Sequence, residues 1–183
     1  MNTYLKFYNY TRMENSLKIW TMIISFVNVV PLLLIAQNSP NDYLKAHNDA
    51  RKEVGVKPLE WDPQLASHAG EFVEKHIADC ITGLIDVAFP GTYGQNAAYN
   101  SVSETGTEAV AAWVQQKYNY DYKSNSCVDG TTSCHCYTQI VRDTVTLLGC
   151  ARVECRNYGG TLTTCLYYPE DAVLNQQRPY KLH

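Results

Sequence analysis

Seven cysteines constrain the fold of this chain more than any other feature, and all of them follow an apolar N-terminal segment. They are Cys80, Cys127, Cys134, Cys136, Cys150, Cys155 and Cys165. Cysteines behind an export signal are typical of a disulfide framework formed in an oxidising compartment. Because the count is odd, at least one thiol is unpaired or is joined to another molecule.

The N-terminal segment has the layout of a secretory signal peptide. Three basic residues open it, residues 19–35 carry no charge, and Ala36 supplies the small residue expected at a cleavage site. The alternative is a membrane anchor, which we disfavour because Asn28 and Pro31 interrupt the run and a span needs about 20 apolar residues. Met13 is an alternative start that would give a leader of more usual length.

The signal peptide is predicted over residues 1–36, which leaves one domain over residues 37–183. Residues 37–183 carry 12 of the 15 basic and 17 of the 18 acidic residues, a net charge of −5 at pH 7. Nucleic-acid-binding domains depend on positive charge, so this composition argues against a nucleic-acid partner.

Cap residues and helical spacing predict four helices. Ser39-Pro40 opens the first helix and Gly55 suits its C-terminal stop, while Asp62-Pro63 opens the second. Apolar residues at helical spacing predict a third helix over 104–117, and a short fourth helix is expected over 137–143.

Two strands are predicted near residues 146–155 and 161–168, and the turn Tyr158-Gly159-Gly160 between them indicates a hairpin. Residues 81–102 contain glycine and proline and are predicted to form a loop. Helices followed by an antiparallel hairpin indicate an α+β domain.

Several short motifs follow one another in a fixed order along the chain. They are His47-Asn48-Asp49-Ala50-Arg51, Pro58-Leu59-Glu60-Trp61-Asp62, Asp79-Cys80, Tyr93-Gly94-Gln95-Asn96, Trp113, Tyr137-Thr138-Gln139-Ile140-Val141, Leu148-Gly149-Cys150-Ala151 and Gln177-Arg178-Pro179-Tyr180. In this order the chain from Gln37 to Tyr180 resembles the CAP superfamily of cysteine-rich secretory proteins, antigen 5 and pathogenesis-related protein 1. Gln37-Asn38-Ser39-Pro40 and the Arg-Pro-Tyr ending resemble its plant branch.

The resemblance implies a three-layer α-β-α sandwich with a C-terminal antiparallel hairpin, and a tail from about residue 169. It also implies a secreted, apoplastic protein of plant defence without a cofactor. The disulfide pairs that the resemblance implies are Cys80 with Cys155, Cys127 with Cys134, and Cys150 with Cys165. Cys136 is then the free thiol, which could compete for Cys127 or join two otherwise monomeric chains.

The sequence does not favour an enzyme. A Gly-x-Ser-x-Gly nucleophile motif is absent. His135 and Cys136 are adjacent, so they point about 100° apart on a helix and to opposite faces of a strand. His47 and Arg51 lie four residues apart on one helix face, with Asn48 between them. They could form a ligand site, but we favour a motif that ties the helix to its neighbours.

The resemblance also places two histidines and two glutamates around a metal ion in a central cleft, and this chain departs from that pattern. The corresponding positions hold Leu84, Gln95, Gln116 and Cys136. Leucine offers no lone pair, neutral amides are weaker donors than carboxylates, and one thiol does not make a zinc site. His135 is one position off, which turns its side chain away. We predict that the cleft persists as a neutral pocket without metal.

Four aromatic residues lie near a loop that similar proteins use for sterols. They are Trp113, Tyr118, Tyr120 and Tyr122. Aromatic rings suit flat apolar ligands, although these rings could equally cover the core. The resemblance thus implies a sterol or lipid partner, together with pathogen or receptor proteins.

An alternative function is that of a precursor of a signalling peptide. Similar proteins carry a Cys-Asn-Tyr-x-Pro junction before that peptide, and a Gly-Asn pair within it. This chain has Cys165-Leu166-Tyr167-Tyr168-Pro169, lacks the pair in Glu170-Asp171-Ala172-Val173, and ends in an additional Lys181-Leu182-His183. We therefore predict inefficient release.

Overall fold

The computed structural model describes residues 38–77, 93–128, 130, 132–156, 159–169 and 177–182. The predicted signal peptide and two predicted site residues, Cys80 and Leu84, lie outside this set. None of the helices in these ranges has the length and hydrophobicity that crossing a bilayer requires.

The first two helices begin at the cap residues that the sequence indicates, and the third begins two residues later than predicted. The helices are α2 (Pro40–Glu53), α3 (Pro63–His76), α4 (Gly106–Gln115) and α5 (His135–Ile140), with a 3₁₀ turn η2 (Gln116–Asn119) after α4. Ser39 and Thr105 form capping boxes at α2 and α4, and the Asp62 carboxylate accepts two backbone N–H groups at α3. Gly55 follows α2 with a φ of 73°, a conformation that glycine adopts without strain.

Four strands form the main sheet, in the order β1-β5-β6-β2. They are β1 (Glu60–Trp61), β2 (Gly94–Asn100), β5 (Leu147–Glu154) and β6 (Thr161–Tyr168). β1 runs parallel to β5, whereas β5 and β2 both pair antiparallel with β6. A second, two-stranded sheet joins β3 (Tyr120–Asp121) to β4 (Ser126–Cys127).

The predicted loop over residues 81–102 is wrong in its last part, because residues 94–100 form β2. This segment contains no β-branched residue, so its sequence gives little strand signal. Its extended conformation comes from pairing with β6 along its whole length, from Gly94 opposite Tyr167 to Asn100 opposite Thr161. The fourth helix is also displaced: α5 begins at His135 rather than at residue 137.

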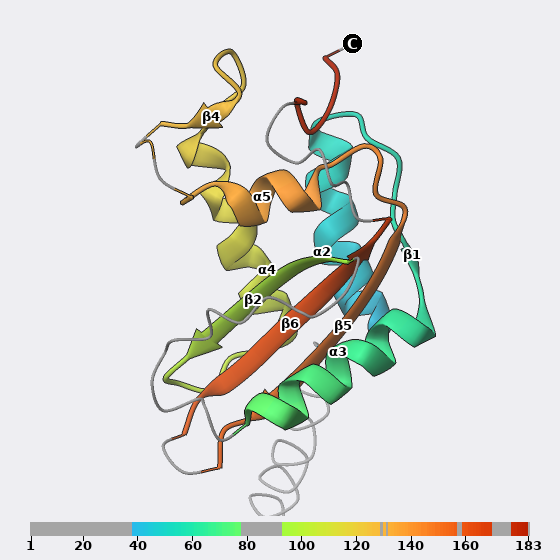
Figure 1. Ribbon diagram of the computed structural model, residues 1–183, viewed down its shortest axis with the longest axis vertical. Coiled ribbons are helices and arrows are strands. Elements are labelled where there is room, and N and C mark those ends of the chain that lie inside the picture. Colours follow the sequence, from blue (N-terminus) through green and yellow to red (C-terminus); the bar gives the residue numbers. More distant parts are fainter. Residues whose placement is uncertain are drawn as a thin grey trace, which may run out of the picture. The chain divides into compact units, whose positions relative to one another are not determined.

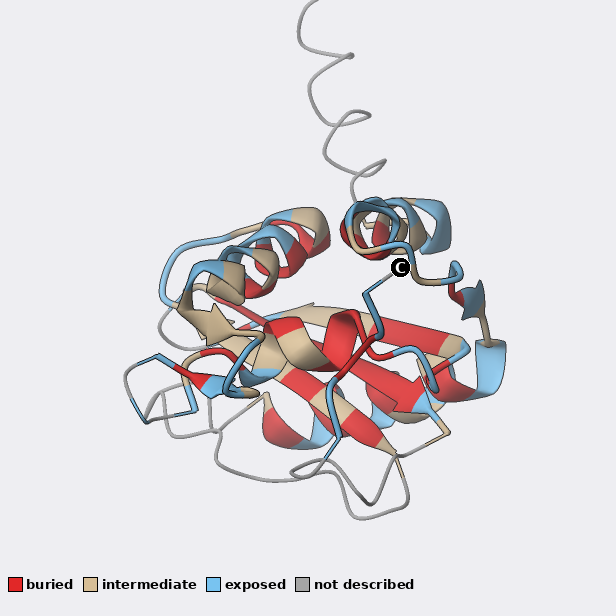
Figure 2. Cartoon of the chain, turned by 90° about the horizontal axis from the view of Figure 1, so that it is seen from above, coloured by how far each residue is buried: buried red, intermediate tan, exposed pale blue. Residues whose placement is uncertain are grey.

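Helices cover both faces of the sheet and give the expected α-β-α sandwich (Figure 1). On one face, α3 packs Phe72 and Val73 against Leu162 of β6. On the other face, α2, α4 and α5 enclose the larger core cluster with Leu148 and Tyr167. Figure 2 shows buried residues concentrated in the strands and on the helix surfaces that turn toward them.

Two disulfides are formed within the described ranges, and both are pairs that the resemblance implies. Cys150 and Cys165 face each other across β5 and β6 with Cα atoms 4.0 Å apart. A crosslink over a loop of this size contributes about 3 kcal/mol. The second disulfide joins Cys127 in β4 to Cys134 directly before α5. Cys155 also takes part in a disulfide, but the predicted Cys80–Cys155 pair lies outside the described residues.

Close approach of α3 to β5 depends on Gly149. A Cβ atom at this position would collide with the backbone of Leu65 and Ala66 at the start of α3. A glycine here therefore lets the helix and the strand pack directly against each other.

We expect Gly149→Ala to lower the free energy of unfolding by about 1–3 kcal/mol, because the added methyl group meets rigid backbone. Gly70→Ala in α3 is the matched control, since a Cβ there meets no atom within 4 Å. The control should stabilise by about 0.5–1 kcal/mol through helix propensity. Denaturant unfolding of the disulfide-intact protein measures both; equal effects would show that α3 can shift away from β5.

Candidate functional site

His47 is fully buried on α2, and both of its ring nitrogens are hydrogen-bonded. Nδ1 lies 2.8 Å from the Tyr43 carbonyl oxygen and Nε2 lies 2.9 Å from the Tyr167 hydroxyl. A carbonyl only accepts, so Nδ1 carries the hydrogen and Nε2 accepts from the phenol. Burial lowers the pKa of His47 to about 4, so the imidazole ring is neutral at neutral pH.

The amide side chain of Asn96 extends this hydrogen-bonded contact across the sheet. Asn96 of β2 donates from Nδ2 to the Tyr167 hydroxyl and to the Cys136 carbonyl oxygen, each at 3.0 Å. The chain of hydrogen bonds thus links α2, β6, β2 and α5. Asn96 lies in a motif noted in the sequence, but its role and that of Tyr167 depend on strand pairing, which the sequence did not reveal.

Arg51 is buried one turn further along α2, with only 1% of its surface exposed. Its Nε donates to the Lys57 carbonyl at 2.7 Å, and its terminal nitrogens donate to the carbonyls of Ile140, Arg142 and Val145 at 2.8–2.9 Å. Burial lowers its pKa to about 10, so the guanidinium remains charged at neutral pH. The charge is balanced by carbonyl dipoles from two loops.

Asn48 completes the motif by pairing with the backbone of Leu59. Its Nδ2 donates to the Leu59 carbonyl at 3.1 Å, and its Oδ1 accepts from the Leu59 N–H at 2.7 Å. This two-way contact holds the residue before β1 beside α2. The polar side chains of His47, Asn48 and Arg51 are therefore used inside the fold, not presented to a ligand.

The four aromatic residues predicted to contact sterol do not share one surface. Trp113 is buried in the main core cluster. Tyr120 and Tyr122 are partly buried, with ring centroids 6.4 Å apart in an edge-to-face arrangement. Tyr120 also donates its hydroxyl to Asn125 Oδ1 at 2.8 Å.

Tyr118 is the exposed member of the group, at 72% relative exposure. Val128 is 64% exposed, and its N–H donates at 2.8 Å to the carbonyl of Asn119, the residue that follows Tyr118. The Cys127–Cys134 disulfide fixes the chain beside Val128. Tyr118 and Val128 are thus two exposed side chains on segments that this backbone hydrogen bond joins.

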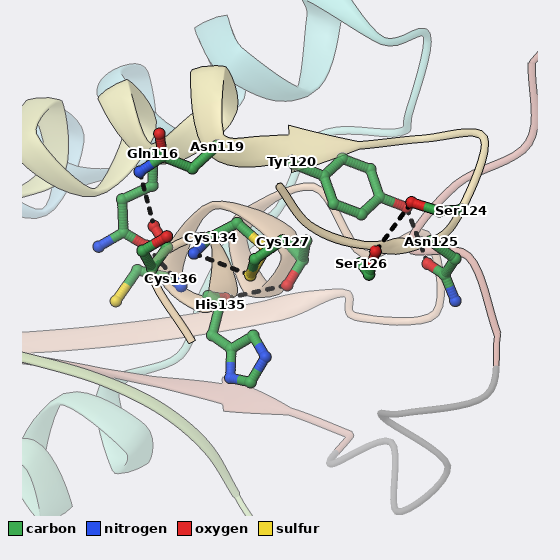
Figure 3. The surroundings of a disulfide bond; sticks show 12 residues. Gln116, Asn119, Tyr120, Ser124, Asn125, Ser126, Cys127, Cys134, His135 and Cys136 are labelled. Atoms are coloured by element: carbon green, nitrogen blue, oxygen red, sulfur yellow. Dashed lines mark hydrogen bonds between the residues drawn. A yellow bond between two sulfur atoms is a disulfide. The ribbon is translucent and has the colours of Figure 1, made fainter. Parts of the chain in front are cut away.

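Cys136, the free cysteine among the residues described, is partly buried beside Gln116. Its backbone N–H donates to Gln116 Oε1 at 3.0 Å, and burial raises the pKa of its thiol. Figure 3 shows its sulfur pointing away from the Cys127–Cys134 disulfide and the His135 ring extending in a different direction. The structure therefore brings Gln116 and Cys136 together without forming a Cys–His pair.

Comparison with known families identifies the fold. A model described as "CAP: Cysteine-rich secretory protein family" matches residues 44–167. The chain belongs to the CAP family. The matched region runs from Leu44 in α2 to Tyr167 in β6 and so includes the side chains of His47, Asn96 and Tyr167 and both described disulfides.

Relatives of similar sequence are plant proteins of one type. "Pathogenesis-related protein 1" of Arabidopsis thaliana is 40% identical over 161 residues, covering 86% of this chain and 94% of its own. "Basic form of pathogenesis-related protein 1" of Nicotiana tabacum is 46% identical over 147 residues, covering 79% and 77%. The solved structure of Schistosoma mansoni venom allergen-like protein 4 is 25% identical with a TM-score of 0.58, covering 78% of this chain and 94% of that chain.

The residues at the family's metal positions do not fit a divalent ion. Gln95 donates from Nε2 to Thr164 Oγ1 at 3.1 Å, and Gln116 Oε1 already accepts from the Cys136 N–H. Burial raises the pKa of the Cys136 thiol and so disfavours the thiolate that a metal ligand requires. His135 is exposed and directed elsewhere.

A second grouping of metal-ligating residue types lies in the core. His47, Cys150 and Cys165 have their ligand atoms within 4.8 Å of one another. Both sulfurs belong to a disulfide and therefore supply no thiolate, and both His47 nitrogens are hydrogen-bonded. This grouping is part of the structural core.

The buried neutral His47 should make the fold sensitive to acid. Because the unfolded chain binds this proton near pH 6.5 and the folded chain only near pH 4, acidification favours unfolding. The contribution is complete above pH 6.5 and is lost as the pH falls to 4, which amounts to about 3 kcal/mol. Unfolding free energies of wild type and His47→Gln, measured from pH 7 to pH 4, should show the wild type losing more. Parallel curves would contradict a neutral buried imidazole.

Proposed function

We propose that the chain is a secreted, non-catalytic protein of plant defence that acts by binding an apolar ligand such as a sterol. Its membership of the CAP family and its similarity to plant pathogenesis-related proteins support the defence role and the extracellular location. Disulfides within the domain are consistent with an oxidising compartment.

The use of the polar residues supports a function without catalysis. A nucleophile needs a neighbouring base and a group that orients that base. The Cys136 thiol has a raised pKa, and His47 is enclosed in the core. His47 and Arg51, the helix-motif residues that could serve in catalysis, are instead hydrogen-bonded to a buried phenol and to backbone carbonyls.

One observation carries the proposal of an apolar ligand: Tyr118 and Val128 are exposed, and the Val128 N–H bond to the Asn119 carbonyl joins their two segments beside the Cys127–Cys134 disulfide. An apolar side chain held out on a rigid element loses little entropy when a ligand covers it. The flat tyrosine ring suits a sterol face, and Val128 adds a second apolar contact. Receptor or pathogen proteins remain further proposed partners of the same exposed surface.

We expect Tyr118→Ser and Val128→Ser each to weaken sterol binding about tenfold, the effect of losing one well-buried apolar contact. Binding of a fluorescent sterol to the disulfide-intact protein measures the change. Val102→Ser is the matched control, because Val102 is also 64% exposed but lies beyond the opposite end of α4. An equal loss in all three variants, or no loss in the first two, would remove this surface as the site.

We also propose that this member has no tight metal site. Calorimetric titration of the metal-free protein with zinc should therefore give no stoichiometric binding, because neutral amides occupy the places of carboxylates. Zinc binding that survives Cys136→Ser but is lost in Gln95→Ala would show that these residues do form a metal cleft.

The alternative function is a precursor of a C-terminal signalling peptide. A protease could reach the candidate cleavage junction, because β6 ends at Tyr168, which is 45% exposed, and Pro169 follows it. The changed junction sequence and the extended C-terminus still predict inefficient release.

A further inference from the structure

The C-terminal residues Arg178–Tyr180 are seated on the tyrosine-rich loop. The Arg178 guanidinium lies 5.2 Å from the Tyr122 ring centroid and donates to the carbonyls of Tyr122 and Lys123, each at 3.1 Å. The Tyr122 hydroxyl donates to the Tyr180 carbonyl at 3.0 Å, and the two rings lie 5.1 Å apart. Tyr122 thus contacts both ends of the Arg-Pro-Tyr segment.

Pro179 and Tyr180 reach further, into the core of the domain. The Asp143 N–H donates to the Pro179 carbonyl at 2.7 Å. Tyr180 is only 7% exposed and belongs to the main core cluster with Tyr137. Each of the three tail residues therefore has a separate contact: a ring face for arginine, a backbone donor for proline, and a buried pocket for tyrosine.

We propose that the surface formed by Tyr122, Lys123 and Asp143 is a binding site for an Arg-Pro-Tyr peptide, and that it retains the C-terminal segment after cleavage at Tyr168–Pro169. The part that concerns cleavage rests on the alternative function, a peptide precursor. An endopeptidase would hydrolyse the bond with one water, leaving a carboxylate on Tyr168 and an amine on Pro169. The contacts of Arg178–Tyr180 would be unaffected by this step.

Release then has two steps, cleavage and dissociation. While the tail is tethered, its effective concentration at the site is of millimolar order, so the site stays filled. Cleavage removes the tether, and occupancy then depends on the affinity of Arg178–Tyr180 for the site. The docking contacts, and not the cut alone, thus set how much peptide leaves the protein.

The test uses the full chain with a site for a sequence-specific protease replacing residues 170–176. The protein is folded, cut and dialysed at about 100 μM, a concentration that fills a micromolar site. The C-terminal fragment should remain with the protein. Arg178→Ala and Tyr180→Ala should each weaken retention about tenfold, as expected for arginine and tyrosine anchors. Free equilibration of the wild-type fragment across the membrane would overturn the proposal.

Two controls separate docking from folding. Leu182→Ala changes a side chain that is 70% exposed, and it should leave retention unchanged. Tyr122→Phe keeps the ring under Arg178 but removes the bond to Tyr180, so it should weaken retention less than Tyr180→Ala. Thermal melts of the uncut variants show whether each one folds. If Leu182→Ala lowers retention as much as Arg178→Ala, the site is not specific and the proposal fails.

Mass spectrometry of secreted fluid tests the precursor function separately. Absence of any product cut before Pro169 would refute that function, while the dialysis result alone decides the binding site.

Discussion

Four hydrogen bonds from the Arg51 guanidinium hold two loops against α2, one after that helix and one between α5 and β5. A buried charge without partners would cost several kcal/mol, and here carbonyl dipoles replace a carboxylate as its partners. The segment held in this way includes Asp143, whose N–H binds the Pro179 carbonyl. The position of the C-terminal tail therefore depends on an arginine near the start of the domain.

His47 acts on the same helix by a different means. Its contact to Tyr167 and the contact of Tyr167 to Asn96 are neutral hydrogen bonds in a region without water access, where such bonds are strong and an unpaired group is costly. Arg51 tolerates burial as a cation because four carbonyl oxygens accept its hydrogen bonds, whereas His47 tolerates burial only as a neutral ring. The same face of α2 therefore carries a permanent cation, Arg51, and a neutral imidazole, His47, whose protonation by acid would destabilise the fold.

The sequence predicts best where local rules apply. Ser39 and Asp62 mark helix starts, because capping depends on residues within one turn. β2 escapes prediction because it has no β-branched residue and becomes extended by pairing with β6. The site divides in the same way. His47, Asn48 and Arg51 form a recognisable helix motif, but Asn96 and Tyr167 join it only after the sheet has formed.

Backbone hydrogen bonds of Cys136 join the elements that carry Gln95 and Gln116, two of the positions that the resemblance assigns to a metal site. In the family pattern, an ion would connect the strand at Gln95, the turn at Gln116 and the helix at Cys136. Here the Cys136 backbone makes the same connections, since its carbonyl accepts from Asn96 on β2 and its N–H donates to Gln116 on η2. The Cys127–Cys134 disulfide adds a covalent link directly before α5. Such contacts require neither deprotonation nor an ion, so this corner of the domain is held by neutral bonds at any pH at which the fold persists.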